Sequence, residues 1–434
     1  MKKQPEIYDF DEIVFPSIKR IKLNDFTTVY TVPDKSQDIC RIQLILNGGD
    51  ADEHLDHLAR ITTMMTNQGS EQLNCKEIAE LLDYCGTNFS STTVAFYSIY
   101  DLITLTRLTD KIIPILEQII KYPIFPEVNL ETLKTNCIEG LKARMKKNKV
   151  LAEITFRNLF YSNRHFLGKI PEIQNISKIT RDNVIEFYDT YCRAKNVKVV
   201  LSGNINDKLI TDIGNIFNSE WHKHGKLPKR NRNILETSGI NEIKIVNTPN
   251  AVQSSIIIGM PTINRKHEDY IPLRIATYLL GGYFGSRLMQ NIREDKGYTY
   301  GIYAQLTSSN KTGVFKINTD CDIKYTYQVI REVNIEMEKL KSKLVPDSEL
   351  QMVKSSMLSS IAKLIDSPFD IADYIASKKN VVAAKRFFNN QIEGIRNITA
   401  EKIRETAKKY FNSERFITVI ATDENKLKKI PLEH

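Results

Sequence analysis

The sequence predicts an α+β protein with two homologous domains, each a mostly antiparallel sheet with helices packed on one face. Two observations support this prediction. The chain has 434 residues, which is long enough for more than one hydrophobic core. In addition, Pro126 and Pro346 each begin a long amphipathic helix, and similar elements precede and follow both helices.

In the first half, alternating and helical hydrophobic patterns follow one another in a definite order. The predicted elements are a strand at 42–46, a strand pair at 87–107, a helix at 109–121, a helix from Pro126, a helix at 181–191 and a strand at 197–202. Helices that follow a strand pair in this way cover a sheet formed largely by neighbouring antiparallel strands.

The second half repeats this order. Its predicted elements are a strand pair at 299–319, a helix at 323–341, a helix from Pro346, a helix at 400–410 and a strand at 416–421. We therefore predict domains at 1–220 and 241–434, joined by a linker at 221–240. The linker is rich in Lys, Arg, Asn and Gly, a composition that lets two domains face each other.

Composition excludes several classes of protein. The net charge of +9 comes from basic residues interleaved with acidic ones, and the cluster Lys223 to Arg232 is typical of a solvated linker, so no nucleic-acid partner is expected. The sequence contains no window of 18 apolar residues and no secretion signal, so we expect neither a membrane protein nor an exported one. The six cysteines form no Cys-x-x-Cys motif, which favours reduced thiols and a cytoplasmic location.

A candidate site lies at Arg293 and Tyr300. An apolar helical run ends at Arg293, Gly297 permits the helix to stop, and a strand-like alternation follows. A guanidinium binds a peptide carbonyl or carboxylate through a planar fork of donors, and a tyrosine hydroxyl can donate to a developing oxyanion. Neither group activates water at neutral pH, so this pair needs a metal or a base from elsewhere.

The segment Leu279 to Leu288, leading into Arg293 and Tyr300 of a duplicated chain, resembles the pitrilysin/insulinase family of zinc metallopeptidases. The similarity is to the bacterial short-chain branch related to the mitochondrial processing peptidase. This resemblance implies that Arg and Tyr of the second domain complete a zinc site in a first domain. It also places three glycines beside the cleft as substrate-binding residues, namely Gly281, Gly282 and Gly285.

The family's first domain carries His-x-x-Glu-His on a helix, in which two imidazoles bind zinc and the glutamate activates water. The motif should precede a Gly-Ser step, which occurs here as Gly69-Ser70. Counting back from this step, the five motif positions are Arg60, Ile61, Thr62, Thr63 and Met64. None of them is a zinc ligand, so we expect this chain to bind no metal there.

His54 and His57 remain an alternative metal site, because residues three apart can share a helix face. Asp56 points elsewhere, and no glutamate takes the position of a general base between the two histidines. The nearest formal match, from Asp50 to His54, directly follows a glycine and precedes any helix. Glu139 lies near the position expected for a third ligand, but we interpret it as a surface helix residue.

The remaining candidates receive plainer interpretations. We expect solvated side chains at four histidines, namely His165, His222, His224 and His267. Tyr298 is expected on the same strand face as Tyr300 and could substitute for it, although the family spacing favours Tyr300.

The leading hypothesis is a non-catalytic subunit of a two-subunit metallopeptidase, in which Arg293 and Tyr300 act on a peptide substrate at zinc bound by the partner. The partner would be a homologous subunit carrying His-x-x-Glu-His, or a second copy in a homodimer. Two alternatives stay open: a stand-alone zinc endopeptidase with an unconventional site at His54 and His57, and a catalytically dead peptide-binding scaffold.

Overall fold

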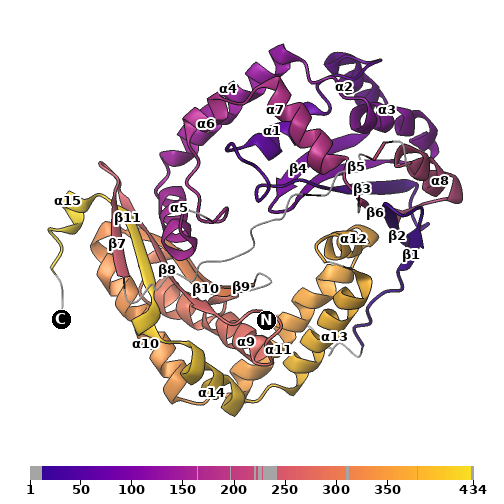
Figure 1. Ribbon diagram of the computed structural model, residues 1–434. Helices are drawn as coiled ribbons and strands as arrows, with labels where there is room; N and C mark the ends of the chain where they lie inside the picture. Colours follow the sequence, from indigo (N-terminus) through magenta and orange to yellow (C-terminus); the bar gives the residue numbers. More distant parts are fainter. Residues whose placement is uncertain are drawn as a thin grey trace, which may run out of the picture.

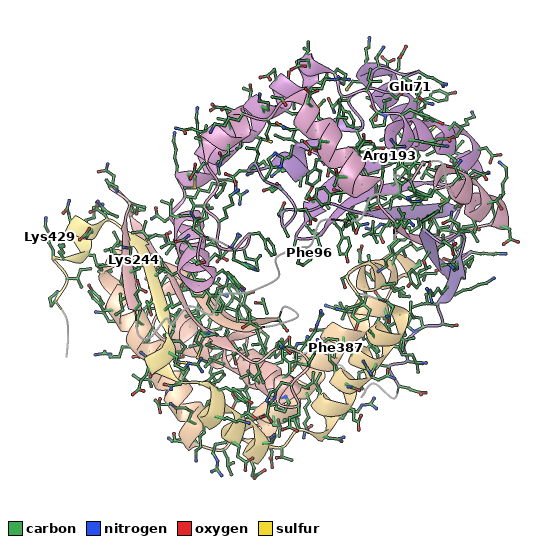
Figure 2. The ribbon with its side chains drawn as sticks, in the orientation of Figure 1. Glu71, Phe96, Arg193, Lys244, Phe387 and Lys429 are labelled. Atoms are coloured by element: carbon green, nitrogen blue, oxygen red, sulfur yellow. The ribbon has the colours of Figure 1, made fainter. Side chains whose placement is uncertain are left out.

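The computed structural model describes residues 12–163, 165–195, 197–218, 221, 222, 227, 242–308, 312–378 and 380–431 (Figure 1). Each half of the chain forms one sheet, and most of the helices lie on the outer side of the two sheets. Figure 2 shows the side chains of both halves in the same orientation. The chain is therefore an α+β protein built from two similar halves, as the repeated order of elements predicts.

The first sheet contains six strands in the order β1-β2-β6-β3-β5-β4. They are β1 (Lys19–Lys22), β2 (Thr27–Pro33), β3 (Ile39–Asn47), β4 (Asn88–Val94), β5 (Tyr97–Leu105) and β6 (Val197–Gly203). Only β2 and β6 pair in parallel, so the sheet is mostly antiparallel. Strand β4 forms one edge and is half-buried at every second residue, which places one of its faces against the helices.

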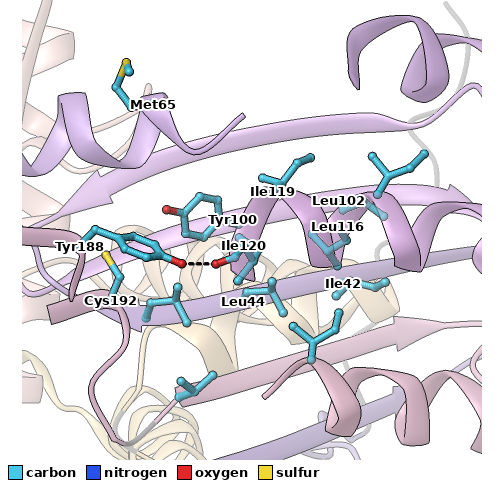
Figure 3. Packing of buried hydrophobic residues seen from close by; sticks show 14 of the residues in the cluster. Ile42, Leu44, Met65, Tyr100, Leu102, Leu116, Ile119, Ile120, Tyr188 and Cys192 are labelled. Carbon is cyan, nitrogen blue, oxygen red and sulfur yellow. Dashed lines mark hydrogen bonds between the residues drawn. The ribbon is translucent and has the colours of Figure 1, made fainter. Parts of the chain in front are cut away.

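Helices of the first half share one hydrophobic core with this sheet. They are α1 (Leu58–Met65), α2 (Cys75–Tyr84), α3 (Thr109–Lys121), α4 (Glu127–Met145), α6 (Ile173–Ser177), α7 (Arg181–Phe187) and α8 (Asp207–Ile216). Figure 3 shows part of the resulting core, in which the buried Tyr188 hydroxyl donates a hydrogen bond to the Ile120 carbonyl. This bond satisfies a polar group that would otherwise be costly to bury.

The second sheet contains five strands in the order β7-β11-β8-β10-β9. They are β7 (Glu242–Asn247), β8 (Gln253–Thr262), β9 (Thr299–Ser308), β10 (Gly313–Asp322) and β11 (Ile417–Thr422). Strands β7 and β11 form the parallel pair, and β9 forms an edge. The helices of this half are α9 (Tyr270–Gly281), α10 (Thr326–Ser342), α11 (Asp347–Ala362), α13 (Val381–Asn397), α14 (Ala400–Tyr410) and α15 (Glu424–Leu427).

Two helices are exchanged between the halves: α5 (Asn148–Tyr161) and α12 (Pro368–Ala376). Helix α5 leaves the first half and packs on β8 and β11 of the second, whereas α12 leaves the second half and packs on β6 and β2 of the first (Figure 1). Each sheet thus has helices of its own half on one face and a helix of the other half on the opposite face. The prediction placed helices on one face of each sheet, and the structure adds one helix of the other half on the opposite face.

Apolar contacts hold both exchanged helices. Phe156 and Phe160 of α5 belong to a buried cluster with residues of β8 and β11, and Ile371 and Ile375 of α12 belong to one with residues of β2 and β6. Gly259 of β8 makes room for α5, because a Cβ atom there would lie 2.5 Å from the Phe156 ring. The exchange therefore depends on complementary shape as well as on apolar burial.

Polar contacts add to this attachment. The Lys198 ammonium on β6 donates hydrogen bonds to the carbonyls of Ile375 (2.6 Å) and Lys378 (2.8 Å) at the end of α12. On the other side, Lys316 of β10 forms an ion pair with Glu153 of α5 (2.8 Å). A cation at the end of α12 satisfies carbonyl groups that have no partner within the helix.

The first two residues of the predicted linker, Trp221 and His222, pack against the first half. Trp221 and His222 are only 2% exposed, and Trp221 belongs to the core of the first half, so these two residues are part of that half. Most of 223–241, including most of the basic cluster Lys223 to Arg232, lies outside the described residues. The domain limits 1–220 and 241–434 stay a prediction.

In the part of the chain that the structure describes, no helix combines the length and the apolar character needed to cross a bilayer. All six cysteines carry free thiols, and four of them are buried. The cytoplasmic location stays a prediction.

Candidate functional site

Arg293 lies in a π-helical segment, Met289–Asp295, which ends where Gly297 adopts a positive φ of 65°. The predicted stop at this glycine is confirmed, because such a backbone conformation favours glycine. The guanidinium carbon lies 4.5 Å from the centre of the Phe284 ring, and Nε lies 3.3 Å from a carboxylate oxygen of Glu294. The side chain is about one third exposed (33%), so it can still reach a ligand.

Two buried carboxylates on α10 anchor the segment that carries Arg293. The Asn291 amide donates to Glu332 (3.0 Å) and Glu336 (2.7 Å), and Lys296 forms an ion pair with Glu332 (2.6 Å). Burial opposes ionisation of Glu332, but the hydrogen bonds from Lys296 and Asn291 outweigh it and lower the pKa of Glu332. This anchor was not predicted from the sequence, although two acidic residues four apart on one helix face are a visible signal.

Tyr300 lies near the start of the edge strand β9 and is 89% exposed. An irregularity in the pairing with β10, between Thr319 and Cys321, interrupts the alternation of the strand at this point. The neighbouring Thr299 is buried, and its hydroxyl donates to the Asp320 carbonyl (2.6 Å). The backbone around Tyr300 is therefore fixed while the phenol faces solvent.

Tyr298 does not share this position. It precedes β9, is half-buried and stacks on Tyr325 with ring centres 4.3 Å apart. The expectation that Tyr298 and Tyr300 occupy one strand face is wrong, because the strand begins after Tyr298 and the pairing irregularity follows.

Close packing accounts for the glycines at and after the end of α9. A Cβ atom on Gly281 would lie 2.6 Å from the Ala304 nitrogen on β9, and one on Gly282 would lie 2.5 Å from the Tyr278 Cα atom. At Gly285 the nearest atom, in the Tyr283 ring, would be 3.0 Å away. The close approach of α9 to β9 explains Gly281, and a substrate-binding role for these glycines stays a prediction.

Helix α1 occupies the position that the resemblance assigns to the zinc-binding helix. Arg60 is exposed, Thr63 is buried and Met64 is half-buried. These three residues line a pocket of about 410 Å³ between α1 and β4. The other lining residues are Asn67, Gln68, Ser91, Thr92 and Thr93.

This pocket does not fit a zinc ion. Zinc is held by thiolate, imidazole or carboxylate groups, whereas the motif positions Arg60, Thr63 and Met64 offer a cation, a hydroxyl and a thioether. Across the described residues, no group of three or more His, Cys, Asp and Glu side chains could hold a metal ion.

The alternative pair His54 and His57 lies just before α1. His57 is the N-cap residue, and its Nδ1 atom is buried, whereas His54 is exposed. Burial, assisted by Arg60, lowers the pKa of His57. Glu53, which precedes both histidines, accepts the backbone N–H groups of His57 (3.2 Å) and Ala59 (3.1 Å), so its carboxyl group caps the helix.

Two further acidic candidates have structural partners. Asp56 is buried and forms an ion pair with Lys169 (2.6 Å), while Glu139 is a surface residue paired with Lys142 (2.9 Å). The interpretation of Glu139 as a surface helix residue is confirmed.

The expectation of solvated histidines is wrong at two positions. His165 is 5% exposed, stacks on Tyr161 and accepts the Leu167 N–H through Nδ1, while His222 is 2% exposed beside Trp221. Both rings fill apolar space. Their burial could not be predicted because many of the neighbouring residues in the sequence are polar. His267 is exposed as expected. His224 lies outside the described residues.

Comparisons with known proteins agree with this fold. A family model described as "Peptidase M16 inactive domain" matches residues 178–357. A protein of Rickettsia felis named "Uncharacterized zinc protease" is 25% identical over 402 residues, which cover 90% of this chain and 94% of the relative. A "Non-peptidase homolog YmxG" of Helicobacter pylori is 25% identical over 267 residues, or 60% of this chain and 61% of that protein.

Among solved structures, a peptidase M16 inactive domain from Pseudomonas fluorescens superimposes with a TM-score of 0.83 at 19% identity. The match covers 94% of this chain and 98% of that one. The two halves together therefore have the same overall fold as that structure.

Proposed function

Because this chain is a relative of the M16 peptidases, the pitrilysin/insulinase-like zinc metallopeptidases, we propose that it is the non-catalytic subunit of a two-subunit metallopeptidase. Relatives of this chain include both a protein named a zinc protease and one named a non-peptidase homolog. The residues on α1 favour the second kind of relative for this chain.

One observation carries the proposal: the expected zinc ligands are lacking on α1, whereas the Arg/Tyr pair of the second half is present. Helix α1 holds Arg60, Thr63 and Met64 at the metal positions. In the second half, Arg293 is partly exposed on a turn anchored by buried carboxylates, and the nearby Tyr300 is exposed. An accessible cation and phenol on a fixed backbone suit a site completed by another molecule.

In the proposed complex, Arg293 holds a carbonyl or carboxylate of the peptide through its fork of donors. Tyr300 donates its hydroxyl hydrogen to the oxyanion that forms during hydrolysis. Zinc and the general base belong to a homologous partner carrying His-x-x-Glu-His. A peptide substrate could add a strand to an exposed sheet edge in the space between the subunits.

Metal analysis and activity of the purified chain give the first part of the test. We expect no stoichiometric zinc and no peptide hydrolysis from this chain alone, and hydrolysis when the partner is added. One tightly bound zinc per chain, removable with loss of activity, would contradict the proposal and favour the stand-alone enzyme.

Variants of the pair give the second part. In the complex, Tyr300→Phe should lower kcat by about 100-fold, the usual cost of removing one oxyanion donor, and Arg293→Ala should weaken substrate binding and turnover. Tyr303→Phe on the same strand and Arg386→Ala on α13 are matched controls, because both residues are exposed. If the pair variants leave turnover at the control level while the complex still assembles, the chain is a scaffold.

A further inference from the structure

The pocket between α1 and β4 has a built polar lining. Burial alternates along β4, and Ser91 and Thr93 share the half-buried face that packs toward α1. From α1 and the turn after it come Arg60, Asn67 and Gln68. The pocket has a volume of about 410 Å³, and most of its lining residues carry hydrogen-bonding groups.

The hydroxyl groups of the pocket are ordered from within. Thr93 donates to the Thr63 hydroxyl (3.1 Å), which lies 2.7 Å from the Ser98 hydroxyl, and Ser98 donates to the Gly48 carbonyl (2.7 Å). This chain of hydrogen bonds ties the inner wall to the backbone of the first sheet. The wall is therefore a fixed surface for a ligand.

The amide groups present donors. Gln68 Nε2 donates to Asn67 Oδ1 (2.9 Å), and Gln68 Oε1 accepts from the Asn129 side chain (3.1 Å). Each of the two amide oxygens thus already accepts a hydrogen bond within the protein. Among the described residues the Asn67 NH₂ group has no acceptor, so it can donate to an acceptor on a ligand.

Arg60 supplies the charge. Its side chain is exposed, and within the described ranges it forms no ion pair. Its charge reaches Asp50: burial raises the pKa of Asp50, and the charges of Arg157 and Arg60 act in the opposite direction. Arg60 also acts on the buried ring of His57 at the start of the helix.

We propose that this pocket binds a carboxylate group of a peptide, with Arg60 as the cation and the Asn67 amide as a second donor. Only the peptide character of the ligand rests on the proposed function. The carboxylate follows from the lining, because a planar fork of donors beside neutral donors matches two carboxylate oxygens. The carboxylate can come from an acidic side chain or from the chain end.

Titration calorimetry with the full chain alone tests the proposal. The probes are one N-acetylated ten-residue peptide with a single internal Glu and a free C-terminus, the same peptide amidated, the peptide with Gln for Glu, and the peptide with both changes. We expect Arg60→Gln and Asn67→Ala to weaken binding of the first peptide, the former by roughly tenfold or more. Arg60→Lys should restore part of the affinity, and Arg386→Gln should have no effect.

The four probes also identify the source of the carboxylate. If amidation abolishes binding, the carboxylate is that of the chain end. If replacing Glu by Gln abolishes binding, the carboxylate is that of the side chain. Equal binding of all four peptides, unchanged binding to Arg60→Gln, or no binding at all would overturn the proposal. None of these results depends on a partner, so the failure of this site is distinct from a failure of Arg293 and Tyr300 in the complex.

Discussion

The pKa of Glu53 is strongly changed by the position of this residue just before α1. Its carboxyl oxygens accept two backbone N–H groups, from His57 and Ala59, that have no partner within the helix. Burial raises the pKa of Glu53 to about 8, the nearby charge of Asp50 adds to this, and the two hydrogen bonds oppose it. The group is therefore largely protonated in the folded chain at neutral pH.

This shift makes stability depend on pH. An acid whose pKa is raised on folding favours the folded state at low pH and loses that contribution as pH rises from about 4.5 to about 8. We expect the free energy of unfolding of the wild type, relative to Glu53→Gln, to fall by up to about 1.4 kcal/mol per pH unit in this window. Urea unfolding at several pH values measures this difference in free energy. If the free energies of unfolding of the two proteins change with pH in parallel, Glu53 titrates normally.

At the scale of elements, local patterns predicted what lies close in sequence. Gly297 ends the Arg293 segment, and the helices at 109–121 and 400–410 have the predicted bounds. The pocket beside α1 could not be predicted, because Arg60 and Thr93 become neighbours only when β4 packs on the helix. The exchange of α5 and α12 was equally hidden, since amphipathicity shows that one helix face is buried but not which sheet buries it.

Gly259 offers a test of the exchange. A Cβ atom there would lie 2.5 Å from the ring of Phe156 on α5 and 2.9 Å from the Phe315 carbonyl. Gly259→Ala should therefore lower the free energy of unfolding by about 1–3 kcal/mol, the usual cost of overpacking. Gly140→Ala on α4 is the control: a Cβ atom at Gly140 would meet nothing within 4 Å, so the change should leave stability unaltered or raise it through the better helix propensity of alanine. If Gly259→Ala is as stable as the wild type, α5 moves aside without cost.

For the whole molecule, the exchange means that neither half is complete alone. Without α12, the first sheet exposes Tyr30, Val32 and Val200, and without α5 the second sheet exposes Ile257 and Val419. Apolar faces of this kind promote aggregation.

We expect residues 1–240 and 241–434 to be poorly soluble when produced separately, because each keeps its own exchanged helix but lacks the other's. Co-expression should give a soluble complex, measured by co-purification and by cooperative unfolding like that of the intact chain. As a control, the intact chain cut by a protease site placed within 228–240 should stay associated. Two soluble, monomeric halves with cooperative unfolding of their own would contradict this interdependence.

The exchange also sets an order of events during synthesis. The last strand of the first sheet, β6, ends at Gly203, but the helix that covers its inner face begins only at Pro368. At about 5–20 residues per second, the ribosome needs roughly 10–30 seconds to travel between these points. For that time the nascent first half exists with an uncovered apolar face, which makes it a natural client for a chaperone that acts during translation.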